Sequence, residues 1–288
     1  MAEEDKDKTT FVSHMGTHRY LRMPFGLRNA PATFQRALDI ILSGVRWQTC
    51  LIYLDDVIVF SETPEQHLED VDEVLRLLGQ AGVSLKLKKC EFFQPKVNYL
   101  GHVITPGKLS VALDRTSGFR DASFPTDKTM LRSFLGAANY YRRFVRDFAK
   151  HAKPLNDMLR KEEPHDFPEP TQEQLDAFER IKTALINPPI LVLPRLGLPL
   201  MLDTDASAYQ LGAALLQQGD PDDPKSWEPI GFFSKGLTSA EKNYSATERE
   251  CLAVVWSATS LRPYIEGQTV RVRTDHDSLK WLLSLIHI

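Results

Sequence analysis

Two adjacent aspartates, Asp55 and Asp56, interrupt an otherwise apolar run over residues 50–60. A run of aliphatic and β-branched residues predicts a buried strand or a tight hairpin. Placing two carboxylates in such a run costs several kcal/mol of desolvation unless a cation compensates them. Two interpretations are open: a surface hairpin that turns at Leu54-Asp55-Asp56, or a divalent-metal site at a hairpin tip.

Length and composition narrow the class of protein. The 288 residues suffice for two or more domains, and the 42% hydrophobic and 25% charged fractions are typical of a globular protein in water. No apolar stretch reaches the roughly 18 residues that cross a bilayer, and the charged N-terminus lacks a signal core. The three cysteines, Cys50, Cys90 and Cys251, lie far apart. We therefore expect an intracellular protein that is not secreted, with neither disulfides nor zinc.

Positive charge is concentrated in one segment, although the formal net charge of the chain is −3. Residues 128–161 hold nine Lys/Arg against Asp147 and Asp157, a local net charge of +7. A solvated helix face is one interpretation. A surface for a phosphate backbone is favoured because the excess is of one sign and is interleaved with Tyr140, Tyr141 and Phe144.

Periodicity predicts the elements around these features. We expect helices over residues 32–43, 65–80 and 172–185, strands over 84–87 and 97–104, and a linker over 162–170. In the second helix the apolar face is predicted to comprise Leu68, Val71, Leu75 and Leu78. In the basic segment, apolar residues recur every three or four positions, which predicts a helical buried face of Phe134, Ala138, Tyr141, Val145 and Phe148.

A second set of acids follows in the last third of the chain. Asp205 ends a strand, Glu250 lies near the start of a helix, and Asp275 ends a short alternating strand, so the three carboxylates can converge at one edge of a sheet. Ser245-Ala246-Thr247-Glu248 is a capping box, which assigns Glu248 to the helix cap and leaves Glu250 for chemistry. Asp203 lies two residues before Asp205 on the same predicted strand, so the two side chains point to the same face of that strand.

Several motifs, taken in order, resemble the reverse transcriptase and ribonuclease H region of gypsy-like long-terminal-repeat retrotransposon polyproteins. The palm motifs are Pro24-Phe25-Gly26 within residues 20–35, Tyr53-Leu54-Asp55-Asp56, residues 82–92, and Tyr99-Leu100-Gly101-His102. The thumb is similar over residues 131–144, and the family breaks the helix just after this stretch. The ribonuclease H motifs are Thr204-Asp205-Ala206-Ser207, Thr247-Glu248-Arg249-Glu250 and Arg273-Thr274-Asp275-His276.

The resemblance implies a multidomain α+β fold. Its parts are a palm with an antiparallel sheet and helices (residues 1–112), a helical thumb (113–161), a connection (162–198), and a truncated ribonuclease H-like α/β domain with a mixed sheet (199–288).

The resemblance also implies RNA-directed DNA polymerase and ribonuclease H activities, each with two Mg²⁺ per site (Mn²⁺ being possible). The metal ligands and catalytic residues would be Asp55, Asp56, Asp205, Glu250 and Asp275. The partners would be an RNA template, a DNA primer, deoxynucleoside triphosphates and RNA–DNA hybrid, without a membrane, in a cytoplasmic particle or the nucleus. Nucleotide and template contacts fall on Phe25, Gly26, Tyr53 and Lys89, primer contacts on Leu100, Gly101 and His102, and backbone contacts on Arg142, Arg143, Arg146, Lys150 and Lys153.

Two departures from the family pattern keep alternatives open. The family's first polymerase aspartate lies upstream of Pro24, and the only acids there in this chain belong to a charged tail. The family's fourth ribonuclease acid lies beyond Asp275, and in this chain the helix expected from residue 278 is cut short. We therefore expect no polymerase activity from this chain alone. The alternatives are a nonenzymatic nucleic-acid-binding remnant of a decayed element and a nuclease without polymerase function.

Overall fold

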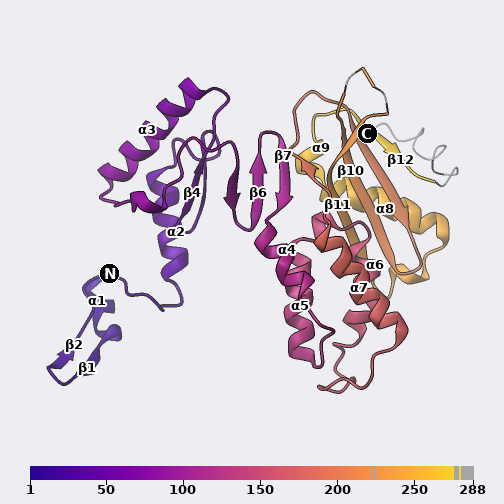
Figure 1. Cartoon of the computed structure of the whole chain (residues 1–288), viewed down its shortest axis with the longest axis horizontal. Coiled ribbons are helices and arrows are strands. Elements are labelled where there is room, and N and C mark those ends of the chain that lie inside the picture. The colour runs from indigo at the N-terminus through magenta and orange to yellow at the C-terminus, as the bar shows by residue number, and fades with distance from the viewer. Residues whose placement is uncertain (221, 224, 276–278, 280–288) are drawn as a thin grey trace. The chain divides into compact units, whose positions relative to one another are not determined.

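The chain divides into two compact units, residues 1–93 and 94–288, in a computed structural model (Figure 1) that describes residues 1–220, 222–223, 225–275 and 279. The domain boundaries inferred from the sequence stay predictions. Within the described residues, no helix is both long enough and apolar enough to cross a membrane. The expected helix from residue 278 lies, apart from Leu279, outside the described residues.

The first unit centres on a β-hairpin packed between two helices. Its buried core joins Leu38 and Leu42 to Cys50 of the hairpin and to Val74 and Leu78. The elements are α1 (Glu3–Lys6), β1 (Phe11–Ser13), β2 (Gly16–His18), α2 (Ala30–Ile41), β3 (Cys50–Tyr53), β4 (Asp56–Val59) and α3 (Pro64–Gln80).

Two expectations for this unit are wrong, the first of them only in part. In α3 the buried residues are Asp70, Val74 and Leu78, whereas Leu68 and Leu75 are exposed. Periodicity marks two adjacent stripes on this helix, and Asp70 can enter the buried one because its carboxylate accepts hydrogen bonds from Ser61 Oγ (2.5 Å) and Gln66 Nε2 (3.0 Å). Residues 84–87 form no strand, since they pair with no neighbouring strand and only a 3₁₀ turn, Leu87–Lys89, follows.

The second unit begins with a small antiparallel sheet in the order β5-β6-β7-β8, made of β5 (Val97–Tyr99), β6 (His102–Thr105), β7 (Lys108–Val111) and β8 (Leu191–Val192). The strand expected over residues 97–104 is therefore two strands. Leu100 and Gly101 reverse the chain between them, with φ values of 50° and 75°.

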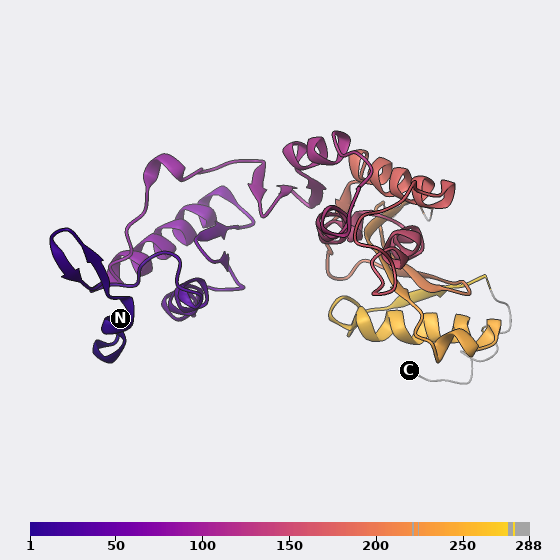
Figure 2. The ribbon, with the colours of Figure 1, turned by 90° about the horizontal axis from the view of Figure 1, so that it is seen from below.

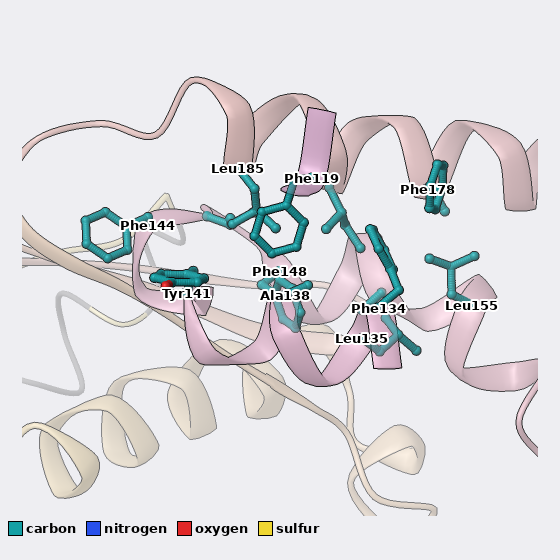
Figure 3. Packing of buried hydrophobic residues seen from close by; sticks show 14 of the residues in the cluster. Phe119, Phe134, Leu135, Ala138, Tyr141, Phe144, Phe148, Leu155, Phe178 and Leu185 are labelled. Carbon is teal, nitrogen blue, oxygen red and sulfur yellow. The ribbon is translucent and has the colours of Figure 1, made fainter. Parts of the chain in front are cut away.

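Four helices next to this sheet enclose the largest core of the unit: α4 (Leu113–Arg120), α5 (Lys128–Tyr140), α6 (Phe148–Asp157) and α7 (Gln172–Ile186). All five residues of the apolar stripe predicted for the thumb are buried, and Figure 3 shows four of them, Phe134, Ala138, Tyr141 and Phe148, packed with Phe119 and Phe178. The helix does break, as the resemblance implies, but the break begins earlier than expected: α5 ends at Tyr140, and a 3₁₀ turn, Arg142–Phe144, precedes α6.

The second unit also contains a mixed four-stranded sheet in the order β11-β10-β9-β12. The strands are β9 (Leu200–Ala206), β10 (Gln210–Gln218), β11 (Trp227–Gly236) and β12 (Val270–Arg273); β12 runs parallel to β9 and the other pairs are antiparallel. Helix α8 (Ala246–Ser260), followed by the short α9 (Arg262–Ile265), covers one face, and α6 lies on the other, as Figure 2 shows.

Candidate metal centre

Three carboxylates meet at one edge of the mixed sheet. Asp205 is the penultimate residue of β9, Glu250 is the fifth residue of α8, and Asp275 lies two residues beyond β12. One carboxylate oxygen from each residue lies within 4.8 Å of the other two. Asp205 and Asp275 are exposed, and Glu250 is 7% exposed. The expected convergence is therefore present, and the roles of the three residues as metal ligands stay a prediction.

Strand order explains this convergence. Because β12 pairs with β9 in parallel, with Arg273 opposite Asp203, both strands deliver their last residues to the same sheet edge. Glu250 reaches that edge from α8, and its Oε1 accepts a hydrogen bond from the backbone N–H of Ala206 at 3.2 Å. The third acid is thereby tied to the residue that follows Asp205.

The capping box separates Glu248 from this group. Glu248 accepts a hydrogen bond from Ser245 N at 2.7 Å, and Ser245 Oγ accepts one from Glu248 N at 3.3 Å. The backbone hydrogen bond from Ser245 lowers the pKa of Glu248. The cap predicted from the sequence is confirmed, and it commits Glu248 to the helix start.

Asp203 is neutralised by an ion pair. Its carboxylate accepts two hydrogen bonds from the Arg273 guanidinium, one of them from Nε at 2.7 Å, and this pairing raises the pKa of Arg273. Asp203 shares the β9 strand with Asp205 but is not among the three converging acids.

The donor set suits a hard divalent cation. It consists of carboxylate oxygens alone, which Mg²⁺, Mn²⁺ and Ca²⁺ prefer over the sulfur and imidazole ligands of softer metals. Three like charges within 4.8 Å of one another repel, and a bound cation would relieve that repulsion. The three residues fit a divalent metal centre.

The Asp55–Asp56 pair lies at the tip of the β3–β4 hairpin. Leu54 has a left-handed φ of 53°, and both aspartates are exposed. Within the described part of the chain, no group of three metal-ligating side chains includes either aspartate. This hairpin thus offers a pair of carboxylates, and its metal role stays a prediction.

Gln35 of α2 holds this hairpin tip. Its Oε1 accepts a hydrogen bond from Leu54 N at 2.5 Å, and its Nε2 donates to Asp39 Oδ1 at 2.8 Å and to Ile52 O at 3.4 Å. Sequence reasoning did not assign this role. The only signal was the place of Gln35 at the end of the 20–35 motif.

The remaining predicted contacts occupy varied surroundings. Phe25 and Tyr53 are exposed, Gly26 has a φ of 91°, and Lys89 is exposed on its 3₁₀ turn. Leu100, Gly101 and His102 form the β5–β6 turn and the start of β6. Their roles stay predictions.

The basic segment has mixed roles. Arg142 donates a hydrogen bond to Ser234 O, and Arg143 lies over the rings of Phe233 and Tyr264, so both are engaged with other parts of the second unit. Lys153 forms a 2.7 Å ion pair with Asp157. Lys128, 7% exposed, donates to two backbone carbonyls. Of the five residues predicted to contact the nucleic-acid backbone, Arg146 and Lys150 are exposed.

Comparison with known proteins shows two domain matches. Residues 1–104 match the family described as reverse transcriptase (RNA-dependent DNA polymerase), and residues 171–272 match the RNase H-like domain found in reverse transcriptase.

Curated relatives match over nearly the whole chain. The chain is 41% identical over 99% of its length to the retrovirus-related Pol polyprotein from transposon 297 and 35% identical over 99% to that from transposon gypsy, both of Drosophila melanogaster. It is 32% identical over 96% to the transposon Tf2-3 polyprotein of Schizosaccharomyces pombe. It spans only 26%, 28% and 20% of the length of these relatives.

Solved structures share the fold. The foamy viral protease-reverse transcriptase dRH in complex with double-stranded DNA matches with a TM-score of 0.83 and 23% identity, covering 100% of this chain and 49% of that one. A foamy viral protease-reverse transcriptase in complex with an RNA/DNA hybrid matches with a TM-score of 0.77 and 23% identity, covering 99% of this chain and 38% of that one. Together with the curated relatives, the two domain matches show that the chain carries the reverse transcriptase and RNase H-like domains that are found in retrotransposon Pol polyproteins.

Proposed function

We propose that the second unit supplies a ribonuclease H site that cuts the RNA strand of an RNA–DNA hybrid, with Asp205, Glu250 and Asp275 holding Mg²⁺. The observation that carries the proposal is the approach of these three carboxylates to within 4.8 Å of one another at the sheet edge. The match of residues 171–272 to the RNase H-like domain supports the same assignment.

The three acids differ in exposure and in hydrogen bonding, and we therefore assign them different roles. Asp205 and Asp275 are exposed, so a backbone phosphate can approach them from solvent, whereas the buried Glu250 is anchored through Ala206 N. The ion pair of Asp203 with Arg273 removes one negative charge beside the site and so reduces repulsion of an incoming phosphate. Two Mg²⁺, when bound, would supply charge stabilisation to the attacking and leaving oxygens.

For the polymerase part, we propose that Asp55 and Asp56 contribute two of the metal-binding carboxylates of an RNA-directed DNA polymerase. Phe25, Gly26, Tyr53 and Lys89 would contact deoxynucleoside triphosphate and template. The support is the match of residues 1–104 to the reverse transcriptase family and the exposure of both aspartates at a hairpin tip that Gln35 holds. The primer end would lie at the Leu100–Gly101 turn and His102.

The alternative function, a nonenzymatic nucleic-acid-binding remnant, is favoured by one observation: no third metal-ligating side chain joins Asp55 and Asp56 within the described residues. This alternative predicts duplex binding through the basic segment without catalysis.

The test is cleavage of a hybrid whose RNA strand is end-labelled, in Mg²⁺ or Mn²⁺, by the 288-residue chain. We expect cleavage of the RNA in the hybrid but not of the same RNA alone, and Asp205→Asn should lower the rate by at least about 100-fold, since each lost electrostatic contact to the transition state costs roughly that much. Glu248→Gln is the matched control, because the Glu248 carboxylate caps α8 and is not one of the three converging acids. Cleavage that survives Asp205→Asn contradicts the proposed site, and hybrid binding without cleavage supports the remnant.

A further inference from the structure

The Leu100–Gly101 turn is bonded to the end of the thumb helix α5. The Tyr140 hydroxyl donates to Leu100 O at 2.7 Å, and the Tyr141 hydroxyl donates to Gly101 O at 3.3 Å. Gly101 O also accepts a hydrogen bond from Ala112 N at 3.2 Å. Two consecutive carbonyls of one tight turn are thus held by two consecutive tyrosines that lie 40 positions further along the chain.

The contact with Tyr141 leaves no room for a side chain at position 101. A Cβ on Gly101 would lie 2.6 Å from the Tyr141 hydroxyl oxygen and 3.7 Å from Tyr141 Cζ. The first distance is a clash and the second is an ordinary contact, so the hydroxyl alone creates the conflict. The positive φ of 75° separately favours glycine here.

Tyr141 cannot easily move away from the turn. Its side chain is 5% exposed, with the Phe119 ring 6.1 Å and the Phe144 ring 6.4 Å from its own, centroid to centroid. Figure 3 shows Tyr141 beside Phe144 at one end of the core. Tyr140, in contrast, is 55% exposed. One tyrosine is therefore an internal anchor, while the other borders solvent next to the turn.

His102 lies among the aromatic rings of Tyr140, Tyr141 and Phe144. Its ring lies 5.5, 5.4 and 5.7 Å from those of Tyr140, Tyr141 and Phe144, and Nδ1 is 3.0 Å from Leu100 O. Because a carbonyl oxygen only accepts, Nδ1 carries the proton. Burial lowers the pKa of His102, which favours the neutral imidazole.

We propose that Tyr141 is a positioning residue for the primer strand: with Tyr140, it fixes the Leu100–Gly101 turn to the end of α5, so that turn and thumb helix engage a nucleic-acid duplex as one rigid element. This inference rests on the proposed primer-binding role of the turn. It assigns the two hydroxyls a task that packing alone does not require, since a phenylalanine would fill the same apolar space.

The test compares Tyr141→Phe, Gly101→Ala and the double variant in the 288-residue chain. The strain from the positive φ at residue 101 is the same whether or not Tyr141→Phe is present. The double-mutant cycle therefore isolates the clash between the added Cβ and the Tyr141 hydroxyl. We expect Gly101→Ala to be less destabilising when Tyr141→Phe is also present. Hydrogen exchange at the amides of residues 101 and 102 should rise several-fold in Tyr141→Phe, as expected for a lost hydrogen bond of about 1 kcal/mol. Tyr209→Phe, on the β9–β10 turn, is the matched control.

The readout for positioning is a fluorescent 2-aminopurine at the primer 3′ end of a primer–template duplex. Tyr141→Phe should change this signal at saturating protein, whereas overall affinity, measured by anisotropy, should weaken less than about threefold. An unchanged primer-end signal, together with the expected change in hydrogen exchange, overturns the positioning role and leaves the proposed function intact. Failure of the unsubstituted chain to bind the duplex contradicts both. Tyr140→Phe, at an exposed side chain, gives the same test if Tyr141→Phe does not fold.

Discussion

At the scale of single residues, hydrogen-bond partners decide which acids are available for chemistry. Glu248 and Glu250 lie two positions apart, yet one accepts from the helix cap at Ser245 and the other from Ala206 beside Asp205. Asp203 and Asp205 lie on one strand, and Arg273 forms an ion pair with Asp203, whereas Asp205 belongs to the group of three converging acids. The capping motif revealed the first distinction in the sequence. The pairing of Asp203 with Arg273 depends on the parallel register of β9 and β12, which no local pattern encodes.

A pH-dependent contribution to stability is predicted at Glu241. The hydrogen bond from Lys235 (2.8 Å), followed by that from Thr238 N, lowers the pKa of Glu241 from its ordinary 4.5 to about 2. Because the pKa is lower in the folded chain, the contribution is complete above about 4.5 and is lost as the pH falls through about 2. Glu241→Gln should therefore destabilise the chain at pH 6, and the difference in urea midpoint should shrink below pH 4. The exposed Glu179→Gln is the control. A difference that does not vary with pH contradicts the assignment.

At the scale of elements, several of the described helices were predictable, and the errors have physical causes. The helices at 30–41, 64–80 and 172–186 and the cap of α8 match the expected ones within a few residues, because caps, prolines and apolar spacing act locally. The strand predicted at 84–87 failed since strands need a partner that local alternation does not supply. Residues 97–104 became a hairpin because Leu100 adopts a positive φ that its residue type rarely shows.

The contact between α6 and the mixed sheet could not be predicted either. Asp147, in a left-handed conformation with a φ of 54°, accepts a hydrogen bond from the buried Gln210 Nε2 at 3.2 Å. Gly212 lies opposite Asp205 in the sheet, and a Cβ there would be 2.8 Å from Asp147 Oδ1. The N-terminus of α6 thus abuts the strand pair that carries Asp205.

Gly212→Ala is therefore expected to destabilise the second unit by about 1–2 kcal/mol, the usual cost of a forced close contact. Asp147→Gly, which tolerates the positive φ, should remove most of that penalty in the double variant. The measurement is a double-mutant cycle from urea unfolding. Gly236→Ala, where a Cβ meets nothing within 4 Å, is the matched control on β11. Additive effects of the two substitutions would show that the Asp147 side chain does not clash with a Cβ at position 212.

At the scale of the whole molecule, charge distribution rather than net charge would govern the proposed binding of nucleic acid. The chain carries a formal net charge of −3, yet Arg146 and Lys150 are exposed in its most basic segment. Several neighbouring cations hold the second unit together instead, among them Arg142, Arg143 and Lys128. The sequence shows the excess of charge but not this division, because partners such as Ser234 and Phe233 lie far along the chain.

Neutralising Arg146 and Lys150 together to Gln should weaken binding to RNA–DNA hybrid and reduce the slope of log affinity against log salt by up to about two contacts' worth. Arg120→Gln with Lys242→Gln removes the same charge from exposed positions outside that segment. The affinity is measured by anisotropy across a salt series. Equal slopes in the two double variants would mean that residues 146 and 150 form only a solvated face.

The central claim is that Asp205, Glu250 and Asp275 form a divalent-metal site, and Mn²⁺ binding measured by electron paramagnetic resonance tests it most directly. We expect Glu250→Gln to weaken Mn²⁺ binding by about tenfold or more, because it removes one of three charged oxygen donors within 4.8 Å of one another. Glu248→Gln, two residues away on the same helix, should leave Mn²⁺ binding within about twofold of the unsubstituted chain, since its carboxylate caps α8. Equal losses in the two variants, or a loss confined to Glu248→Gln, would contradict the account.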